Sequence, residues 1–121
     1  MSFDLGVWRS DKSLGRKEAG EIYVRLCGGS TASSGNSPEV SAFYDEITRR
    51  YPEIDTLSED EVDGSPWACA LVRSGQHVLM TIVPSRAEEL VEVVSTLARK
   101  HQLLCFNPQS DDVLVQVPWT M

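Results

Sequence analysis

The sequence predicts an α+β fold, specifically a ferredoxin-like sandwich in which about three helices pack on a mainly antiparallel sheet of four to five strands. Three observations support this prediction. An alternating run opens the chain, two apolar runs flank a Ser-Gly turn, and a capped amphipathic stretch follows them. Two β-α-β crossovers around a hairpin account for this order of elements. With 121 residues, the chain is expected to form one domain that spans residues 1–121.

The N-terminal part of the chain is predicted to form one strand and two helices. Residues 3–8 alternate between apolar and other side chains, which indicates a strand. Ser13 is the expected cap of a helix that ends at two glycines. A loop rich in Gly and Ser at residues 28–36 then leads to Ser37-Pro38-Glu39, which is typical of a helix start. This second helix is expected to end near Tyr51-Pro52.

Residues 53–66 hold six acidic side chains and no basic one. Because like charges repel, we expect an exposed connection that a few apolar side chains pin to the body of the protein. We also expect this segment to bind a protein partner with a basic surface. The candidate partner-binding residues are Glu53, Asp55, Glu59, Asp60, Glu61 and Asp63.

Residues 67–73 and 76–83 are predicted to form a hairpin around the two-residue turn Ser74-Gly75, in which the glycine supplies a positive φ. This turn places Trp67 opposite Ile82 and Leu71 opposite Val78. Both faces of the hairpin are largely apolar. We therefore expect the hairpin to be central in the sheet and covered on both sides, or to offer its second face to a partner.

The C-terminal part is predicted to form a helix and two strands. Pro84 stops the hairpin, and Ser85 with Glu88 is expected to form a capping box that starts a helix over residues 85–101. Strands are expected at residues 103–106 and 113–117, the last one at a sheet edge. The predicted core is led by Leu90, Val94 and Leu97 of the helix against Leu71, Val78 and Met80 of the hairpin.

Composition argues against several classes of function. The net charge is −7, from 18 acidic and 11 basic side chains, and scattered bases do not suit nucleic acid. No stretch approaches the roughly 20 apolar residues of a membrane span. The cysteines Cys27, Cys69 and Cys105 stand in apolar contexts, which predicts buried, reduced thiols. We therefore expect a cytoplasmic protein without an export signal.

No catalytic constellation is predicted. The hairpin register places Cys69 and His77 on opposite faces, and His101 is expected to cap or pack at the end of its helix. A calcium loop in the acidic segment is the weaker alternative, because no acid closes the loop after Gly64. The Gly-Gly pair follows a helix, whereas phosphate-binding glycines precede one. We expect no catalytic, cofactor-binding or metal-binding residue and no cofactor.

Short motifs span nearly the whole chain. They are Phe3-Asp4-Leu5-Gly6-Val7-Trp8, Phe43-Tyr44-Asp45-Glu46-Ile47 with Tyr51-Pro52, Ser65-Pro66-Trp67 and Asn107-Pro108-Gln109. Together they resemble a family of small uncharacterised bacterial proteins, in which Asp commonly precedes the Pro-Gln pair. Asn107 departs from that pattern, so the resemblance implies no acidic role there. Proteins of this kind are often immunity proteins that neutralise secreted toxins, and the resemblance implies no catalytic residue.

Two functions are compatible with the sequence. The first is a non-enzymatic protein-binding module, an immunity protein that neutralises a toxin through its acidic surface. The alternative is a small enzyme or ligand-binding regulatory domain with a pocket between sheet and helices, near Trp67 and Tyr44. Fold class does not decide between them. The concentrated acids and the lack of a catalytic constellation favour the first.

Overall fold

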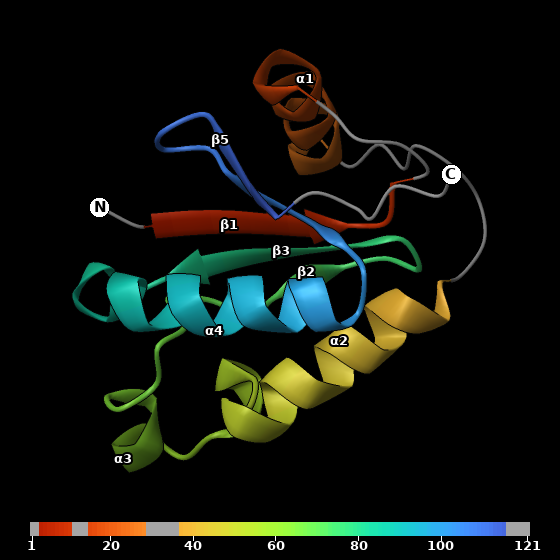
Figure 1. Ribbon diagram of the computed structural model, residues 1–121. Helices are drawn as coiled ribbons and strands as arrows, with labels where there is room; N and C mark the ends of the chain where they lie inside the picture. Colours follow the sequence, from red (N-terminus) through yellow and green to blue (C-terminus); the bar gives the residue numbers. More distant parts are fainter. Residues whose placement is uncertain (1–2, 11–14, 29–36, 116–121) are drawn as a thin grey trace.

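The computed structural model describes residues 3–10, 15–28 and 37–115 (Figure 1). Its strands form one antiparallel sheet in the order β2-β3-β1-β4-β5. The elements in chain order are β1 (Phe3–Trp8), α1 (Arg16–Cys27), α2 (Pro38–Arg50), η1 (Ile54–Thr56), α3 (Glu59–Val62), β2 (Val72–Arg73), β3 (His77–Ile82), η2 (Pro84–Arg86), α4 (Ala87–Lys100), β4 (Leu104–Asn107) and β5 (Asp112–Val115), where η marks a 3₁₀ turn.

This arrangement confirms the predicted α+β fold, with a five-stranded antiparallel sheet and four α-helices among the described residues. The order β2-β3-β1-β4 is the one that two crossovers around a hairpin produce. β5 adds the expected strand at the edge. The ferredoxin-like assignment itself stays a prediction. In the described part of the chain, no helix has the length and apolar character needed to cross a membrane.

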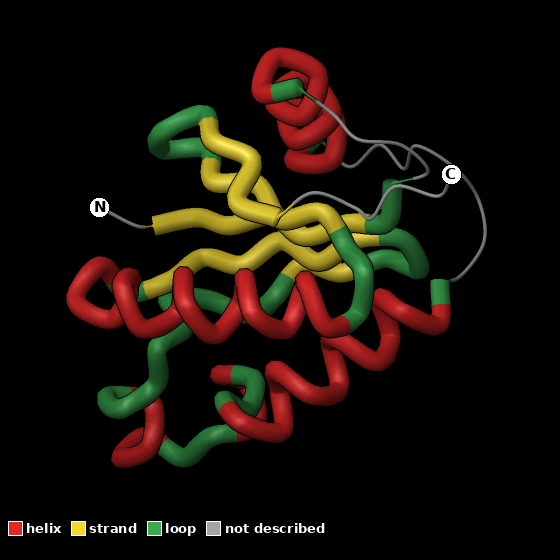
Figure 2. The backbone as a smooth tube through the Cα atoms, viewed as in Figure 1, coloured by secondary structure: helices red, strands yellow, loops and turns green. Residues whose placement is uncertain are grey.

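The central strand β1 is buried on both faces. Leu5 and Val7 belong to the apolar cluster that includes side chains of α2 and α4, whereas Trp8 belongs to the cluster with α1. α1 lies on one side of the sheet and α2 and α4 on the other (Figures 1 and 2). A side chain at Gly6 would have its Cβ 3.0 Å from Tyr23 of α1, so the glycine permits this close packing of helix on strand. The sheet is therefore the middle of three layers.

The first two helices follow their predicted signals where the structure describes them. The Ser37 hydroxyl accepts a hydrogen bond from the Val40 amide at 3.3 Å, with Pro38 in the first turn of α2. α1 begins at Arg16 after Gly15. The predicted cap Ser13 and most of the predicted loop at residues 28–36 lie outside the described residues.

The hairpin register differs from the prediction. Trp67 pairs with Ile82 as expected, but Arg73, and not Leu71, pairs with Val78. The Ser74 hydroxyl accepts hydrogen bonds from the Gln76 and His77 amides. The two-residue loop of the hairpin is therefore Gly75-Gln76 and not Ser74-Gly75. The shift is even, so the residues of β2 and β3 keep their predicted faces, whereas residues 68–71 lie outside the paired strands. It also shortens β2, which lies at the sheet edge, so the hairpin is not central as predicted.

The predicted capping box at Ser85 and Glu88 is not formed. Pro84 instead starts the 3₁₀ turn η2, in which the Arg86 amide donates to the Val83 carbonyl at 2.9 Å, and α4 begins at Ala87. Proline fixes the backbone for such a turn, and the turn delays the helix. The predicted core is confirmed, since its members are buried in one cluster: Leu71, Val78, Met80, Leu90, Val94 and Leu97.

Leu97→Ala is expected to lower the free energy of unfolding by about 2 to 5 kcal/mol, because Leu97 is only 8% exposed within this core. Urea denaturation measures the change. Val24→Ala is the matched control, because Val24 is 69% exposed on α1, and it is expected to change stability by less than about 0.5 kcal/mol. An equally small effect for Leu97→Ala would show that Leu97 does not belong to the core.

Candidate functional site

The acidic segment forms two short helical turns, η1 and α3, beyond the C-terminal end of α2 (Figure 1). The six predicted residues do not play one role. Glu53 is half-buried, and Glu61 is exposed but hydrogen-bonded within its own turn. The remaining acids are exposed, and within the described residues no base pairs with them. We call these four the acidic surface: Asp55, Glu59, Asp60 and Asp63.

Glu53 is a structural residue at the sheet edge. Its carboxylate accepts a hydrogen bond from the Leu71 amide at 3.0 Å, immediately before the edge strand β2, and another from the Tyr44 hydroxyl at 2.5 Å. Burial and this bond to Glu53 raise the pKa of Tyr44. The Arg73 guanidinium lies 4.0 Å from the centre of the Tyr44 ring. These contacts satisfy an amide that would otherwise be an open edge position.

Glu61 closes the capping box of α3. Its carboxylate accepts from the amide and the hydroxyl of Ser58, each at 3.0 Å. These bonds, the one from the amide foremost, lower the pKa of Glu61. Ser58 and Glu61 have the three-residue spacing of a capping box, which predicts a helical turn. The sequence analysis did not identify this signal.

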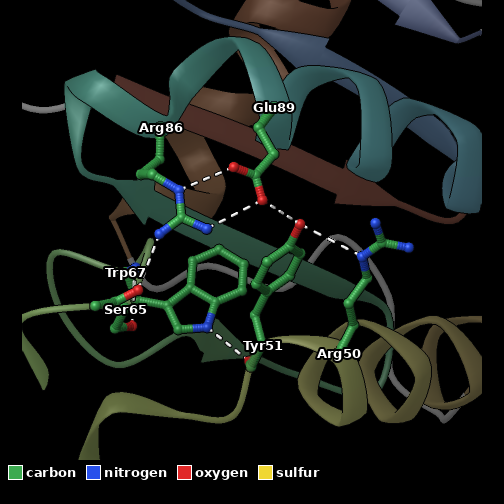
Figure 3. A network of polar contacts seen from close by, with 7 residues as sticks. Arg50, Tyr51, Ser65, Trp67, Arg86 and Glu89 are labelled. Atoms are coloured by element: carbon green, nitrogen blue, oxygen red, sulfur yellow. Dashed lines mark hydrogen bonds and ion pairs between the residues drawn. The ribbon is translucent and has the colours of Figure 1, made fainter. Parts of the chain in front are cut away.

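A polar network fixes the acidic segment to the helices (Figure 3). The Arg86 guanidinium donates twice to the Glu89 carboxylate, at 2.9 and 3.0 Å, and once to the Gly64 carbonyl at 2.9 Å. Tyr51 donates its hydroxyl to Glu89 at 2.5 Å, and the Trp67 indole donates to the Tyr51 carbonyl at 2.8 Å. We call this the Arg86–Glu89 network. It joins the end of α2, the chain after α3, the start of the hairpin and the start of α4.

The charge of Glu89 is stabilised by this network. The hydrogen bonds from Arg86, and secondly from Tyr51, lower the pKa of Glu89 to about 2. Burial and the bond to Glu89 raise the pKa of Tyr51. The Arg50 Nε lies 3.4 Å from the Tyr51 hydroxyl (Figure 3). Polar contacts therefore run from Arg50 through Tyr51 and Glu89 to Arg86. The carboxylate therefore stays ionised at neutral pH.

A groove of about 750 Å³ runs between α2 and α4. The network lies at one end of it. At the other end the Glu46 carboxylate accepts from the Lys100 ammonium and lies 3.0 Å from the His101 Nε2. These partners, Lys100 first, lower the pKa of Glu46. The lining residues are Glu46, Arg49, Arg50, Glu89, Glu92, Val93, Thr96 and Leu97.

The pocket that the sequence analysis placed near Trp67 and Tyr44 stays a prediction. Trp67 is 1% exposed, and both make internal hydrogen bonds. The groove lies instead between the two helices. The residues that the structure describes contain no group of three or more His, Cys, Asp or Glu side chains arranged to hold a metal ion.

Ser74 and His77 form a polar contact that sequence reasoning missed. The Ser74 hydroxyl lies 2.6 Å from the His77 Nδ1 and accepts the Gln76 and His77 amides. Both residues belong to the tight turn, so the spacing Ser-Gly-Gln-His was the available signal. No further group in the described residues bonds to the other ring nitrogen. The contact therefore serves the turn and lacks the third group that orients a catalytic base.

The prediction of three buried thiols was wrong for two of them. Cys105 is buried, whereas Cys27 and Cys69 are exposed. Cys27 follows the buried Leu26, and one residue turns a helix by about 100° away from the packed face. Cys69 lies in the irregular stretch that the shifted hairpin register creates. Burial raises the pKa of the Cys105 thiol to about 12.

Comparison of the chain with protein families, with curated proteins and with solved structures finds no match. The resemblance to a family of small bacterial proteins accordingly stays an expectation. The role of the acidic surface has to be argued from the chemistry of its own residues.

Alkylation of the folded protein is expected to label Cys27 and Cys69 quickly and Cys105 only after unfolding. The reason is exposure, since a thiolate must reach the reagent. Peptide mass spectrometry after timed quenching identifies the labelled sites. Rapid labelling of Cys105 would contradict its position in the sheet.

Acid is expected to destabilise the protein through Glu89. Its pKa is lower in the folded than in the unfolded chain, so its contribution is present above a pH of about 4.5 and is lost as the pH falls towards about 2. Glu89→Gln, and more weakly Tyr51→Phe, should flatten the decline of unfolding free energy in this window. Urea denaturation at a series of pH values measures the slopes. Slopes equal to that of the unmodified protein would show that the network does not form in solution.

Proposed function

We propose that this chain is a non-enzymatic protein-binding module, an immunity protein that neutralises a bacterial toxin with a basic surface. One observation carries the proposal: four exposed acids lie on two consecutive helical turns, and no base among the described residues pairs with them. The proposed partner-binding residues are those of the acidic surface, Asp55, Glu59, Asp60 and Asp63.

Unpaired surface acids suit recognition of a basic protein. They have no internal ion pairs to break, and their combined field extends into solvent, where it attracts a positively charged partner. The net charge of −7 adds to this field. Glu53 and Glu61 stabilise the segment that carries this surface, because Glu53 bonds to the chain before β2 and Glu61 closes the capping box of α3.

The Arg86–Glu89 network supports the same proposal. The Arg86 bond to the Gly64 carbonyl ties the chain after α3 to the start of α4. A surface held in this way loses little conformational freedom when a partner binds. The groove begins at the same network, and the half-buried Val93 in its lining is an apolar contact that a partner could use. Interfaces commonly combine an apolar centre with a polar rim.

The second candidate is a small enzyme or ligand-binding regulatory domain. It is favoured by the size of the groove, about 750 Å³, which falls within the range of small-molecule sites. Arg49 and Arg50 on one side and Glu92 on the other would bind charged groups of a ligand. A bound metabolite without a protein partner would favour this function.

Affinity capture from a lysate of the native host, followed by mass spectrometry, separates the two functions. The baits are the unmodified protein, the double variant Glu59→Lys with Asp60→Lys, and a control with the same number of reversed charges, Glu21→Lys with Asp112→Lys. The control residues are exposed on α1 and β5, away from α3 (Figure 1). A basic protein retained by the first and third baits but not by the second supports the proposal. Equal retention by all three contradicts it.

The captured partner is expected to associate at least about tenfold more slowly with the Glu59→Lys, Asp60→Lys variant than with the unmodified protein. Electrostatic steering raises association rate constants from about 10⁵–10⁶ to about 10⁸–10⁹ M⁻¹s⁻¹. The control double variant should keep the original association rate constant. The free energy of unfolding of each variant should lie within about 0.5 kcal/mol of that of the unmodified protein. Surface plasmon resonance measures the rates. Equal association rate constants for the two variants would show that the partner does not bind at the acidic surface.

A further inference from the structure

The lining of the groove between α2 and α4 combines charged and apolar side chains. Its volume of about 750 Å³ falls within the range of sites that hold small molecules. α2 contributes Glu46, Arg49 and Arg50, which share one face because residues three and four apart in a helix are neighbours. Val93 of α4 is half-buried and gives the groove an apolar patch. The groove therefore offers a ligand both charged and apolar contacts.

Two of the three carboxylates that line the groove are paired with bases. The Lys100 ammonium donates to both oxygens of Glu46 at 3.0 Å, and the Arg86 guanidinium donates to both oxygens of Glu89. Glu92 is exposed, and no base among the described residues pairs with it. The charges that remain for a ligand are those of Glu92 and of the two arginines of α2. The uncompensated charge of the groove is thus positive, although the protein carries a net charge of −7.

The guanidinium groups of Arg49 and Arg50 are open to a ligand. The Arg50 Nε lies 3.4 Å from the Tyr51 hydroxyl, and the guanidinium lies 5.6 Å from the centre of the Tyr51 ring. These contacts hold the side chain while both of its terminal nitrogens point away from Tyr51 (Figure 3). The Arg49 side chain lines the same groove and has no partner among the described residues. Arginine is the preferred residue for binding carboxylate and phosphate oxygens, because its N–H groups match their spacing.

We propose that this groove binds a small organic anion, whose carboxylate or phosphate contacts Arg49 and Arg50 and whose apolar part packs on Val93. The inference deepens the second candidate function and rests on it, since it names the class of ligand for the same groove. Arginine stays protonated at any physiological pH, so the site remains cationic. Glu92 is expected to weaken the binding of an anion, because like charges repel. The acidic surface contributes no residue to this groove, so a failure of the anion site would leave the proposed toxin binding intact.

Titration of the unmodified, ¹⁵N-labelled protein with isovalerate, inorganic phosphate and isoamylamine at constant pH tests this proposal. Isovalerate and isoamylamine share a branched apolar part and carry opposite charges. The Arg50 Nε–H signal and the Val93 amide signal should move and saturate with isovalerate, and saturation by phosphate instead or as well also supports the proposal and shows that a phosphate is accepted. Saturation by isoamylamine at least as strongly as by the anions overturns the anion assignment but keeps a ligand-binding groove. No saturation by either anion also overturns the assignment.

Three variants provide a second measurement, because each removes one charge from an exposed side chain. Arg49→Gln should weaken binding of the active anion about fivefold, the effect of losing one exposed ion pair. Glu92→Gln should strengthen it by at least about twofold, because it removes a like charge. Arg25→Gln on α1, across the sheet from the groove (Figure 1), is the matched control and should leave binding unchanged. Equal affinities of the Arg49→Gln and Arg25→Gln variants would contradict binding by the two guanidinium groups.

Discussion

Burial of the central strand on both faces is the constraint on which the rest of the structure depends. Neither face of β1 is open to solvent at these positions, because Leu5 and Val7 pack against one layer of helices and Trp8 packs against another. Each face needs its own apolar cover, so α1 packs on one side, and α2 with α4 on the other. The acidic segment contributes few apolar side chains to either layer. It is therefore left at the margin, where its charges remain in water.

The Arg86–Glu89 network connects this margin to the core. Tyr51 and Trp67 supply buried rings, and their polar atoms bond to groups at the surface. Such amphipathic side chains let one element belong to the apolar layer and to the polar rim at once. The position of the acidic surface is consequently set by contacts among four segments of the chain. A flexible charged connection would have none of these contacts.

Local patterns predicted the helices and the core between α4 and the hairpin, but not the details of register and polar contacts. The spacing of Leu90, Val94 and Leu97 identified a buried stripe because a helix repeats its faces every few residues. The hairpin register failed because the Ser74 hydroxyl competes for the turn amides. Among the acids, charge density correctly indicated exposure for most. It could not show the internal bonds of Glu53, whose partner Leu71 is distant in sequence and meets it only after the sheet has formed.

The proposed role of the acidic surface depends on an electrostatic field that salt must weaken, since the screening length is only about 8 Å at physiological ionic strength. The most direct measurement is the association rate constant with the captured partner over a series of salt concentrations. It should fall steeply as salt rises, while the dissociation rate constant, which short-range contacts govern, changes little. An association rate constant that is independent of salt would contradict recognition through Asp55, Glu59, Asp60 and Asp63.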